Sequence, residues 1–385
     1  MFRRAMVLLS VAALFASEPL PVTAENAAEE VFPEVSAAAC CLFEAGSETP
    51  VFLRNADVPR PMGHMAKLMT VLICAEACTE GKASMSDTVT VSANANSKQG
   101  AQIWLDAGEE ITVSELMKSI IIGNAGDACC ALSEYLSGSE EQHTKRMNAR
   151  AEKLGMENTR FAEPLGESED TVSTARDIAL LTAELSRHHE LDELFTTRID
   201  RVRDGKTELV STNRLILSYK GIRGTKACGG IKAGECIAAC ADRNGMTMCA
   251  VLLGEPDADS KLRDARELLD CGFESCRLFV PEADGKYLKD ITVTGGCADK
   301  TAVRAEKTPP ALIMAGTAGD IELRAEVTKT LKAPVKRGQT VGTLEYRLGG
   351  EKIAAVKIVA ASDVERMNFG FALKRTLFNL LDITY

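Results

Sequence analysis

The chain has 385 residues, a formal net charge of −10 and 26% charged residues. This length is enough for two domains with separate cores, and a hydrophobic content of 45% is ordinary for a soluble globular protein. The acidic balance gives no electrostatic support for binding nucleic acid, so we expect no nucleic-acid partner.

Residues 1–24 have the pattern of a secretory signal peptide. Arg3 and Arg4 form a basic start, residues 5–16 are apolar, and Val22-Thr23-Ala24 is a small-residue cleavage pattern. The apolar run is too short for a stable membrane span. We therefore expect a secreted, extracytoplasmic protein, with residues 25–35 as a short acidic leader.

Hydrophobic periodicity predicts a first domain over residues 36–278. A strand hairpin over 36–54 comes first, and a helix over 65–77 follows. Thr112 and Glu115 form a capping box that opens the next helix, and Asp127 begins another that runs to Leu136. The remaining expected elements are a helix over 173–185, strands over 221–228, 236–241 and 246–253, and a helix over 262–269.

The pattern changes after Val280-Pro281. Residues 279–361 alternate between polar and apolar with many turns, which predicts a small antiparallel β-sandwich domain. Ser362 and Glu365 form another capping box, so we expect residues 362–385 to form an amphipathic helix. Such a helix fits a membrane surface, and it fits docking on its own protein equally well.

Thirteen cysteines follow the signal-like segment, an odd number that secretion would allow to form disulfides. Cys74 and Cys78 lie at helical spacing, and Cys240 and Cys249 lie in strand-like runs. We interpret most of the cysteines as small buried hydrophobic residues. Because no CxxC pair or His-x-x-Glu-His motif with metal-ligand spacing occurs, the sequence predicts no metal and no other cofactor.

Several short motifs follow this order of elements: Lys67-Leu68-Met69-Thr70, Gly108-Glu109-Glu110-Ile111-Thr112-Val113, Ser173-Thr174-Ala175-Arg176-Asp177, Arg243-Asn244-Gly245-Met246 and Ala333-Pro334-Val335-Lys336-Arg337-Gly338-Gln339. Together they resemble the D-alanyl-D-alanine carboxypeptidases, low-molecular-mass penicillin-binding proteins that trim peptidoglycan stem peptides. The resemblance covers nearly the whole chain. It implies an α/β (α+β) domain with an antiparallel sheet flanked by helices, followed by a small all-β domain. It also implies a stem-peptide partner and serine-type hydrolysis of the terminal D-Ala-D-Ala bond.

The first motif of that family pairs a nucleophilic Ser at a helix start with a Lys one turn later. Lys67 is present, but position 64 holds His. An acyl-imidazole is labile. The longer ring would also displace the reacting atom, and a displacement of ~1 Å can lower the rate on the order of a hundredfold. We therefore expect His64 to be a passive replacement and Lys67 to be a buried structural lysine.

The other two family motifs are also altered. Asn124-Ala125-Gly126 stands where the resemblance places Ser-x-Asn, and both functional side chains have changed. Lys226-Ala227-Cys228 stands in the Lys-Thr-Gly position, and Cys228 adds a Cβ where Gly allows close approach. An alternative register at Lys232-Ala233-Gly234 needs a six-residue deletion, and it too lacks the Thr.

Two loops depart from the family pattern or leave their role open. Glu163-Pro164-Leu165-Gly166 replaces the usual Asn-Pro-His-Gly, and Thr171 stands where His is common. We expect Trp104 to pack against the protein, with binding of the cell wall as the alternative because the family's cleft lies near its loop.

The altered motifs act as a unit in this chemistry, so losing all three leaves little to compensate with. We therefore predict a pseudoenzyme, a binding or scaffolding protein at the cell wall. The alternative is an active serine-type or His64-dependent D-Ala-D-Ala carboxypeptidase, with Ser97 and Ser119 as the nearest replacement serines. A third hypothesis leaves the cleft unused and assigns protein contacts to the β domain.

Overall fold

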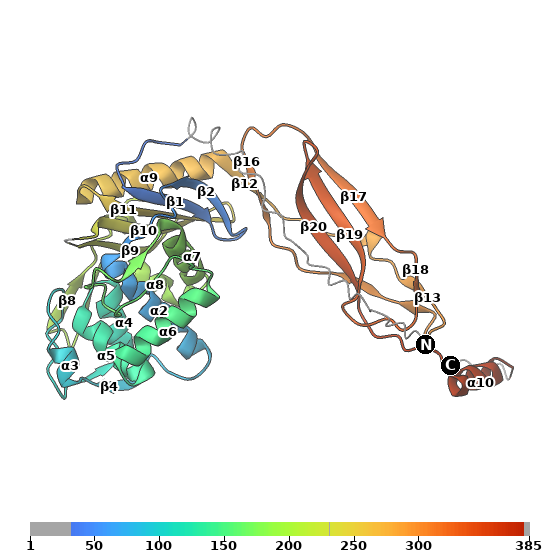
Figure 1. Ribbon diagram of the computed structural model, residues 1–385, viewed down its shortest axis with the longest axis horizontal. Coiled ribbons are helices and arrows are strands. Elements are labelled where there is room, and N and C mark those ends of the chain that lie inside the picture. The colour runs from blue at the N-terminus through green and yellow to red at the C-terminus, as the bar shows by residue number, and fades with distance from the viewer. Residues whose placement is uncertain (1–31, 231, 381–385) are drawn as a thin grey trace, which may run out of the picture.

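The computed structural model describes residues 32–230 and 232–380, so the expected signal peptide lies outside the described residues. Two bodies are visible in Figure 1: an α/β domain and an elongated β domain. Strands β12 (Cys276–Phe279) and β16 (Ala311–Met314) pair with each other where the two bodies meet. The expected fold class, a mixed α/β domain followed by an all-β domain, is confirmed.

A five-stranded antiparallel sheet forms the centre of the first domain, in the order β2-β1-β11-β10-β9. Its strands are β1 (Ala39–Glu44), β2 (Thr49–Arg54), β9 (Ile222–Gly230), β10 (Gly234–Arg243) and β11 (Met246–Glu255). Side chains alternate between the two faces, so neighbouring Cys40 and Cys41 belong to hydrophobic cores on opposite sides.

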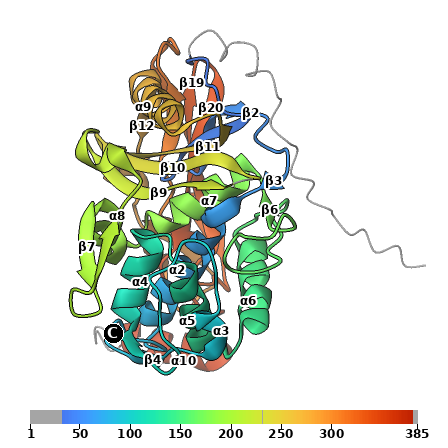
Figure 2. The same ribbon diagram turned by 90° about the vertical axis from the view of Figure 1, so that its left-hand side faces the viewer.

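Each face of this sheet is covered by helices (Figures 1 and 2). Helix α9 (Ala258–Ser275) packs on one face through Ala265, Leu268 and Leu269. It is longer than the predicted 262–269 because Asp257 caps its N-terminus by accepting the N–H groups of residues 259 and 260. Helix α7 (Ala175–Leu185) packs on the other face.

The remaining helices form a lobe below α7 in both views. They are α2 (Lys67–Thr79), α3 (Ala93–Asn96), α4 (Val113–Ile121), α5 (Gly126–Ser137), α6 (Glu140–Lys153) and α8 (Asp192–Thr196). The capping box of Thr112 and Glu115 is confirmed at the start of α4. Helix α6 was not predicted, because most of its residues are polar and only three of them are buried.

Short elements connect these parts. They are the paired strands β3 (Arg60–Pro61) and β6 (Val172–Ser173), β4 (Thr88–Thr90) and β5 (Glu110–Thr112), β7 (Ile199–Val202) and β8 (Thr207–Val210), with the 3₁₀ turns η1 (Gly63–Ala66), η2 (His189–Leu191) and η3 (Arg214–Leu217). Turn η1 runs directly into α2 and therefore sets the start of that helix.

The second domain contains a three-stranded sheet, β14-β13-β18, and a four-stranded sheet, β15-β20-β19-β17. Its elements are η4 (Gly285–Tyr287), β13 (Ile291–Thr294), β14 (Lys300–Thr301), β15 (Val303–Ala305), β17 (Ile321–Val327), β18 (Thr330–Lys332), β19 (Thr340–Leu348) and β20 (Glu351–Ala360). The expectation of a purely antiparallel domain is wrong in one place, since β13 and β18 pair in parallel.

The tail differs from the prediction at its start. Helix α10 (Phe369–Leu380) begins seven residues after Ser362, because the intervening chain is extended and forms bridges from Val364 to Val335 and from Arg366 to Gly296. Ser362 therefore caps no helix. Among the described residues, no helix has the length and apolar character needed to cross a membrane.

Two cysteines are not simple buried hydrophobic residues. Cys240 on β10 and Cys249 on β11 stand directly opposite each other and form a disulfide. Most of the other cysteines are buried, in line with the small-hydrophobe interpretation.

Candidate functional site

His64 lies in the turn η1, one turn before Lys67 at the start of α2. Its Nε2 lies 3.0 Å from Oε1 of Glu167, and its side chain is 18% exposed. Burial, with the nearby charge of Lys67, lowers the pKa of His64 to about 4. The ring is therefore neutral at pH 7, and since a carboxylate only accepts hydrogen bonds, Nε2 carries the hydrogen.

Lys67 is completely buried. Its Nζ donates a hydrogen bond to the backbone oxygen of Asn124 at 2.7 Å, and burial lowers its pKa. This bond joins the start of α2 to the loop before α5. The family motif would have the Lys face a Ser hydroxyl across the same helix turn, but here its neighbour is an imidazole that already has a carboxylate partner.

The second motif lies between α4 and α5. Asn124 has a φ of +59°, and its Oδ1 is buried without a hydrogen-bond partner among the described residues. Gly126 starts α5, and a Cβ there would lie 3.3 Å from Cδ2 of Leu165. Leu165 is itself buried, so the space beside Gly126 is already occupied by an apolar side chain.

The third motif lies on the edge strand β9. Lys226 is 2% exposed, and its Nζ donates to the backbone oxygen of Ile120 at 2.9 Å. Burial, with the charge of Lys67, lowers the pKa of Lys226 to about 7. Ala227 and Cys228 are also buried. Lys232, from the alternative register, is 62% exposed and pairs with Glu169, so the structure brings Lys226 and not Lys232 to this site.

The loop over residues 163–168 closes one side of the site. Glu163 accepts hydrogen bonds from the N–H groups of Leu165 at 2.6 Å and Ser168 at 3.1 Å, which fixes the turn. Gly166 has a φ of +80°, and a Cβ there would lie 1.9 Å from the oxygen of Gly63. Only glycine allows this approach, which sets Glu167 beside His64.

An open hollow of about 820 Å³ adjoins this loop. It is lined by the loop over 98–100, by α6, and by the loop that carries Glu163, Leu165 and Glu167. His64, Lys67 and Lys226 do not line it. The hollow therefore adjoins the altered motifs without opening onto their lysines.

No replacement hydroxyl faces His64 from the two serines that the sequence suggested. Ser97 donates to the backbone oxygen of Asn94, and Ser119 is buried and donates to that of Glu115. Each is held by its own helix. Neither bond places an oxygen next to Lys67, which instead contacts Asn124.

Two residues near the site were missed or misjudged from the sequence. Glu167, the partner of His64, is 103 positions away and has no local signal that could reveal it. Trp104 was expected to pack, but its side chain is 68% exposed. Asp127 explains the difference, because its buried carboxylate binds the backbone on both sides of Trp104.

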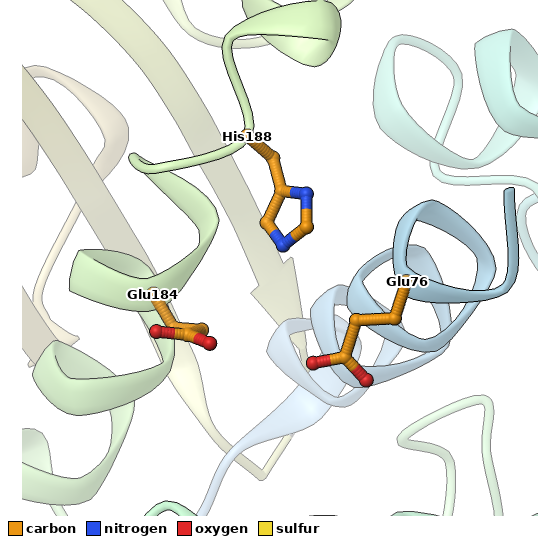
Figure 3. Close-up of side chains that lie close together, drawn as sticks. All are labelled: Glu76, Glu184 and His188. Carbon is orange, nitrogen blue, oxygen red and sulfur yellow. The ribbon is translucent and has the colours of Figure 1, made fainter. Parts of the chain in front are cut away.

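One group of side chains has the composition of a metal site. Glu76, Glu184 and His188 point toward one another from α2, α7 and the turn after α7 (Figure 3), with possible ligand atoms within 4.8 Å. However, the Arg150 guanidinium lies 2.6 Å from Glu76 and 2.8 Å from Glu184. Arg150 thus already supplies the positive charge that a metal ion would bring.

The architecture defines the class of protein. A lysine-bearing helix start, a loop between helices and a sheet-edge strand meet at one point, which is the arrangement of penicillin-recognising serine enzymes. The profile of the D-alanyl-D-alanine carboxypeptidase family matches residues 24–257, and that of the penicillin-binding protein 5 C-terminal domain matches residues 279–366. The chain belongs to the D-alanyl-D-alanine carboxypeptidase family.

Individual relatives agree with this assignment. The chain is 32% identical to D-alanyl-D-alanine carboxypeptidase DacF of Bacillus subtilis over 341 residues, which is 87% of this chain and 88% of the relative. Penicillin-binding protein 5 from Haemophilus influenzae superposes with a TM-score of 0.78 at 25% identity, covering 87% of this chain and 99% of that one. Penicillin-binding protein D2 of Listeria monocytogenes, solved in an ampicillin-bound form, matches with a TM-score of 0.57 at 26% identity, over 63% of this chain and 100% of that one.

Proposed function

We propose that this protein acts outside the cytoplasm at the cell wall, where it binds peptidoglycan stem peptides and hydrolyses the D-Ala-D-Ala bond weakly or not at all. Membership of a carboxypeptidase family supports the wall ligand. The observation that carries the loss of catalysis is the contact between His64 and Glu167, because it places a neutral, already bonded imidazole where the reaction needs a hydroxyl.

The neighbouring groups support the same proposal. Lys67 is bonded to a backbone oxygen instead of a nucleophile, Gly126 has no side chain to hold a substrate amide, and Lys226 is buried against Ile120. Residues that act as a unit lose most of their effect when one is removed, and here several are changed.

Two assays on one preparation test this function. A sugar-free stem peptide ending in D-Ala-D-Ala is titrated by calorimetry, and release of D-Ala is followed in parallel. We expect measurable binding, with D-Ala release no faster than that of the Lys67→Ala variant. Release that Lys67→Ala abolishes would show a working enzyme, and absence of binding would remove the stem peptide as ligand.

A second candidate function has one observation in its favour. Since Nε2 of His64 donates to Glu167, Nδ1 keeps a free lone pair and has the form of a general base that could take a proton from water. A base with a pKa of about 4 is weak, which favours the first proposal. If hydrolysis is detected, His64→Ala and Glu167→Gln should each reduce it; an unchanged rate in both would remove this pair from the mechanism.

We also propose that the tail contacts a membrane surface. Phe369, Leu373 and Leu377 follow helical spacing along α10 and are 83%, 51% and 50% exposed. Figure 1 places α10 at the end of the β domain that is remote from the site. Sedimentation with anionic lipid vesicles should retain the wild type and lose a Leu373→Asp, Leu377→Asp variant. Equal sedimentation of both would contradict the proposal.

A further inference from the structure

The loop over residues 101–105 holds Trp104 in an unusual conformation. Trp104 has a φ of +56°, which bulky residues rarely adopt, and it is the only tryptophan of the chain. Its side chain is 68% exposed. Backbone strain of this kind persists where the surroundings impose it, and it concentrates at functional positions.

The surroundings that impose it are visible in the hydrogen bonds. The buried carboxylate of Asp127 accepts the N–H of Ile103 at 3.0 Å and that of Leu105 at 3.1 Å. Arg203 Nη1 donates to the oxygen of Ile103 at 2.8 Å. Both neighbours of Trp104 are thus fixed from inside the protein, and the indole ring is directed outward.

The ring itself has a polar anchor. With the Gln102 amide turned over, the orientation that its neighbours favour, Oε1 accepts the Nε1–H of Trp104 at 3.1 Å and Nε2 donates to the oxygen of Lys98 at 2.7 Å. Lys98 belongs to the wall of the open hollow, and Gly126 N donates to the oxygen of Ala101 at 2.6 Å. Through Gln102 the indole ring is thus linked to Lys98, and the same loop is bonded to the altered second motif through Ala101.

A rigid, exposed aromatic face with polar neighbours suits a sugar ring. The apolar C–H face of a pyranose stacks on an aromatic ring, and flanking polar groups bind its hydroxyls. Gln102 and Asp106, two positions to either side, supply an amide and an 86% exposed carboxylate. A nucleic-acid base would bring phosphates toward a protein of net charge −10, which disfavours that ligand.

We propose that Trp104, with the hollow wall at Lys98–Gly100, forms a saccharide-binding subsite for an N-acetylated sugar ring of a glycan strand. This subsite rests on the proposed cell-wall function and adds a sugar ligand to it. Lys98–Gly100 line the hollow of about 820 Å³, a volume within the ~300–1,000 Å³ of small-molecule pockets, whereas Trp104 stands outside this lining. Because the ring is fixed before binding, little conformational freedom is lost when a ligand stacks on it.

The single tryptophan makes a direct test available. The full-length protein is titrated with a peptide-free disaccharide of N-acetylated amino sugars, and tryptophan emission is recorded. We expect a saturable change in emission. No change up to millimolar disaccharide overturns the proposal, and so does an equal change with a sugar-free stem peptide, because the ring would then recognise peptide.

Substitutions at Trp104 separate the contribution of the indole ring to binding from that of the residues around it. Measured by calorimetry, Trp104→Ala should weaken disaccharide binding about three- to tenfold, and Trp104→Phe should retain most of the affinity. Leu217→Ala, at another exposed apolar residue (70%), is the matched control and should bind as the wild type does. Wild-type affinity in Trp104→Ala overturns the subsite. Stem-peptide binding is measured separately, so failure of the wall function and failure of this subsite give different results.

Discussion

The Nε2 atom of His64 lies 3.0 Å from Oε1 of Glu167, and the turn η1 approaches the loop of Glu167 this closely because Gly166 has no Cβ, which would lie 1.9 Å from the oxygen of Gly63. This contact gives the imidazole a fixed hydrogen and a fixed partner. It converts the position where the family keeps its nucleophile into a hydrogen-bonded structural junction.

Gly166→Ala should destabilise the protein strongly, because the new Cβ would lie 1.9 Å from the oxygen of Gly63. Gly155→Ala is the matched control, since Gly155 also has a positive φ (+74°) but nothing within 4 Å of an added Cβ. We expect a loss of about 1 kcal/mol in the control from backbone strain alone, and ~2 kcal/mol more at position 166. Urea unfolding measures both. Equal losses would mean that the loops do not approach as described.

The free energy of unfolding should fall as the pH decreases from 6.5 to about 4. In the unfolded chain His64 takes up a proton near pH 6.5, whereas in the folded protein burial delays this until about pH 4. The unfolded state therefore binds more protons in this pH window. As a result the free energy of unfolding falls by about 3 kcal/mol over the whole window between the two pKa values. His143, also buried with a pKa lowered to about 4, contributes in the same direction.

The His64→Gln variant isolates this effect. On acidification its free energy of unfolding should decrease less than that of the wild type. The same is expected of His143→Gln, which removes the second buried histidine. Chemical unfolding at pH 7, 5.5 and 4.5 provides the comparison. If the free energy of unfolding of His64→Gln falls with pH as steeply as that of the wild type, the His64 ring is not held in a buried, neutral state.

Lys226 should make the free energy of unfolding rise with pH on the alkaline side. Burial lowers its pKa from 10.5 to about 7, so between these values the unfolded state holds a proton that the folded state has lost. Lys226→Met should flatten this rise between pH 7 and 10. Lys232→Met, at the exposed lysine, serves as the control and should leave the rise unchanged. A flat wild-type profile would contradict the buried placement of Lys226.

Restoring the nucleophile alone should not restore the reaction. His64→Ser recreates a Ser three residues before Lys67, yet Lys67 still bonds Asn124, and Gly126 still lacks a side chain. We expect acylation by labelled penicillin only a few times faster than in His64→Ala. An increase on the order of a hundredfold would show that the rest of the site is intact and that one substitution silenced it.

Local patterns predicted much of the fold. The hairpin, α2, α4, α5 and the strands β9 to β11 follow from period-2 and period-3.6 hydrophobic patterns that need no knowledge of distant residues. The tail shows the limit of such patterns. Ser362 and Glu365 have the spacing of a capping box. The backbone between them instead forms a strand-like bridge from Val364 to Val335, so no helix starts there.

Only part of the site could be predicted from the sequence. Motif spacing pointed to His64, Lys67 and Lys226, which the structure brings into one region. The contact with Glu167 and the filling of the space at Gly126 by Leu165 both depend on how a distant loop folds back. The exposure of Trp104 depends in the same way on a buried carboxylate that no periodicity identifies.

The intact mass of the protein after incubation with ampicillin shows whether any side chain still forms an acyl-enzyme. A family member that keeps its nucleophile would gain the mass of the opened β-lactam. We predict an unchanged mass for this protein at every time point. A stable adduct on any side chain, located by peptide mapping, would contradict the account.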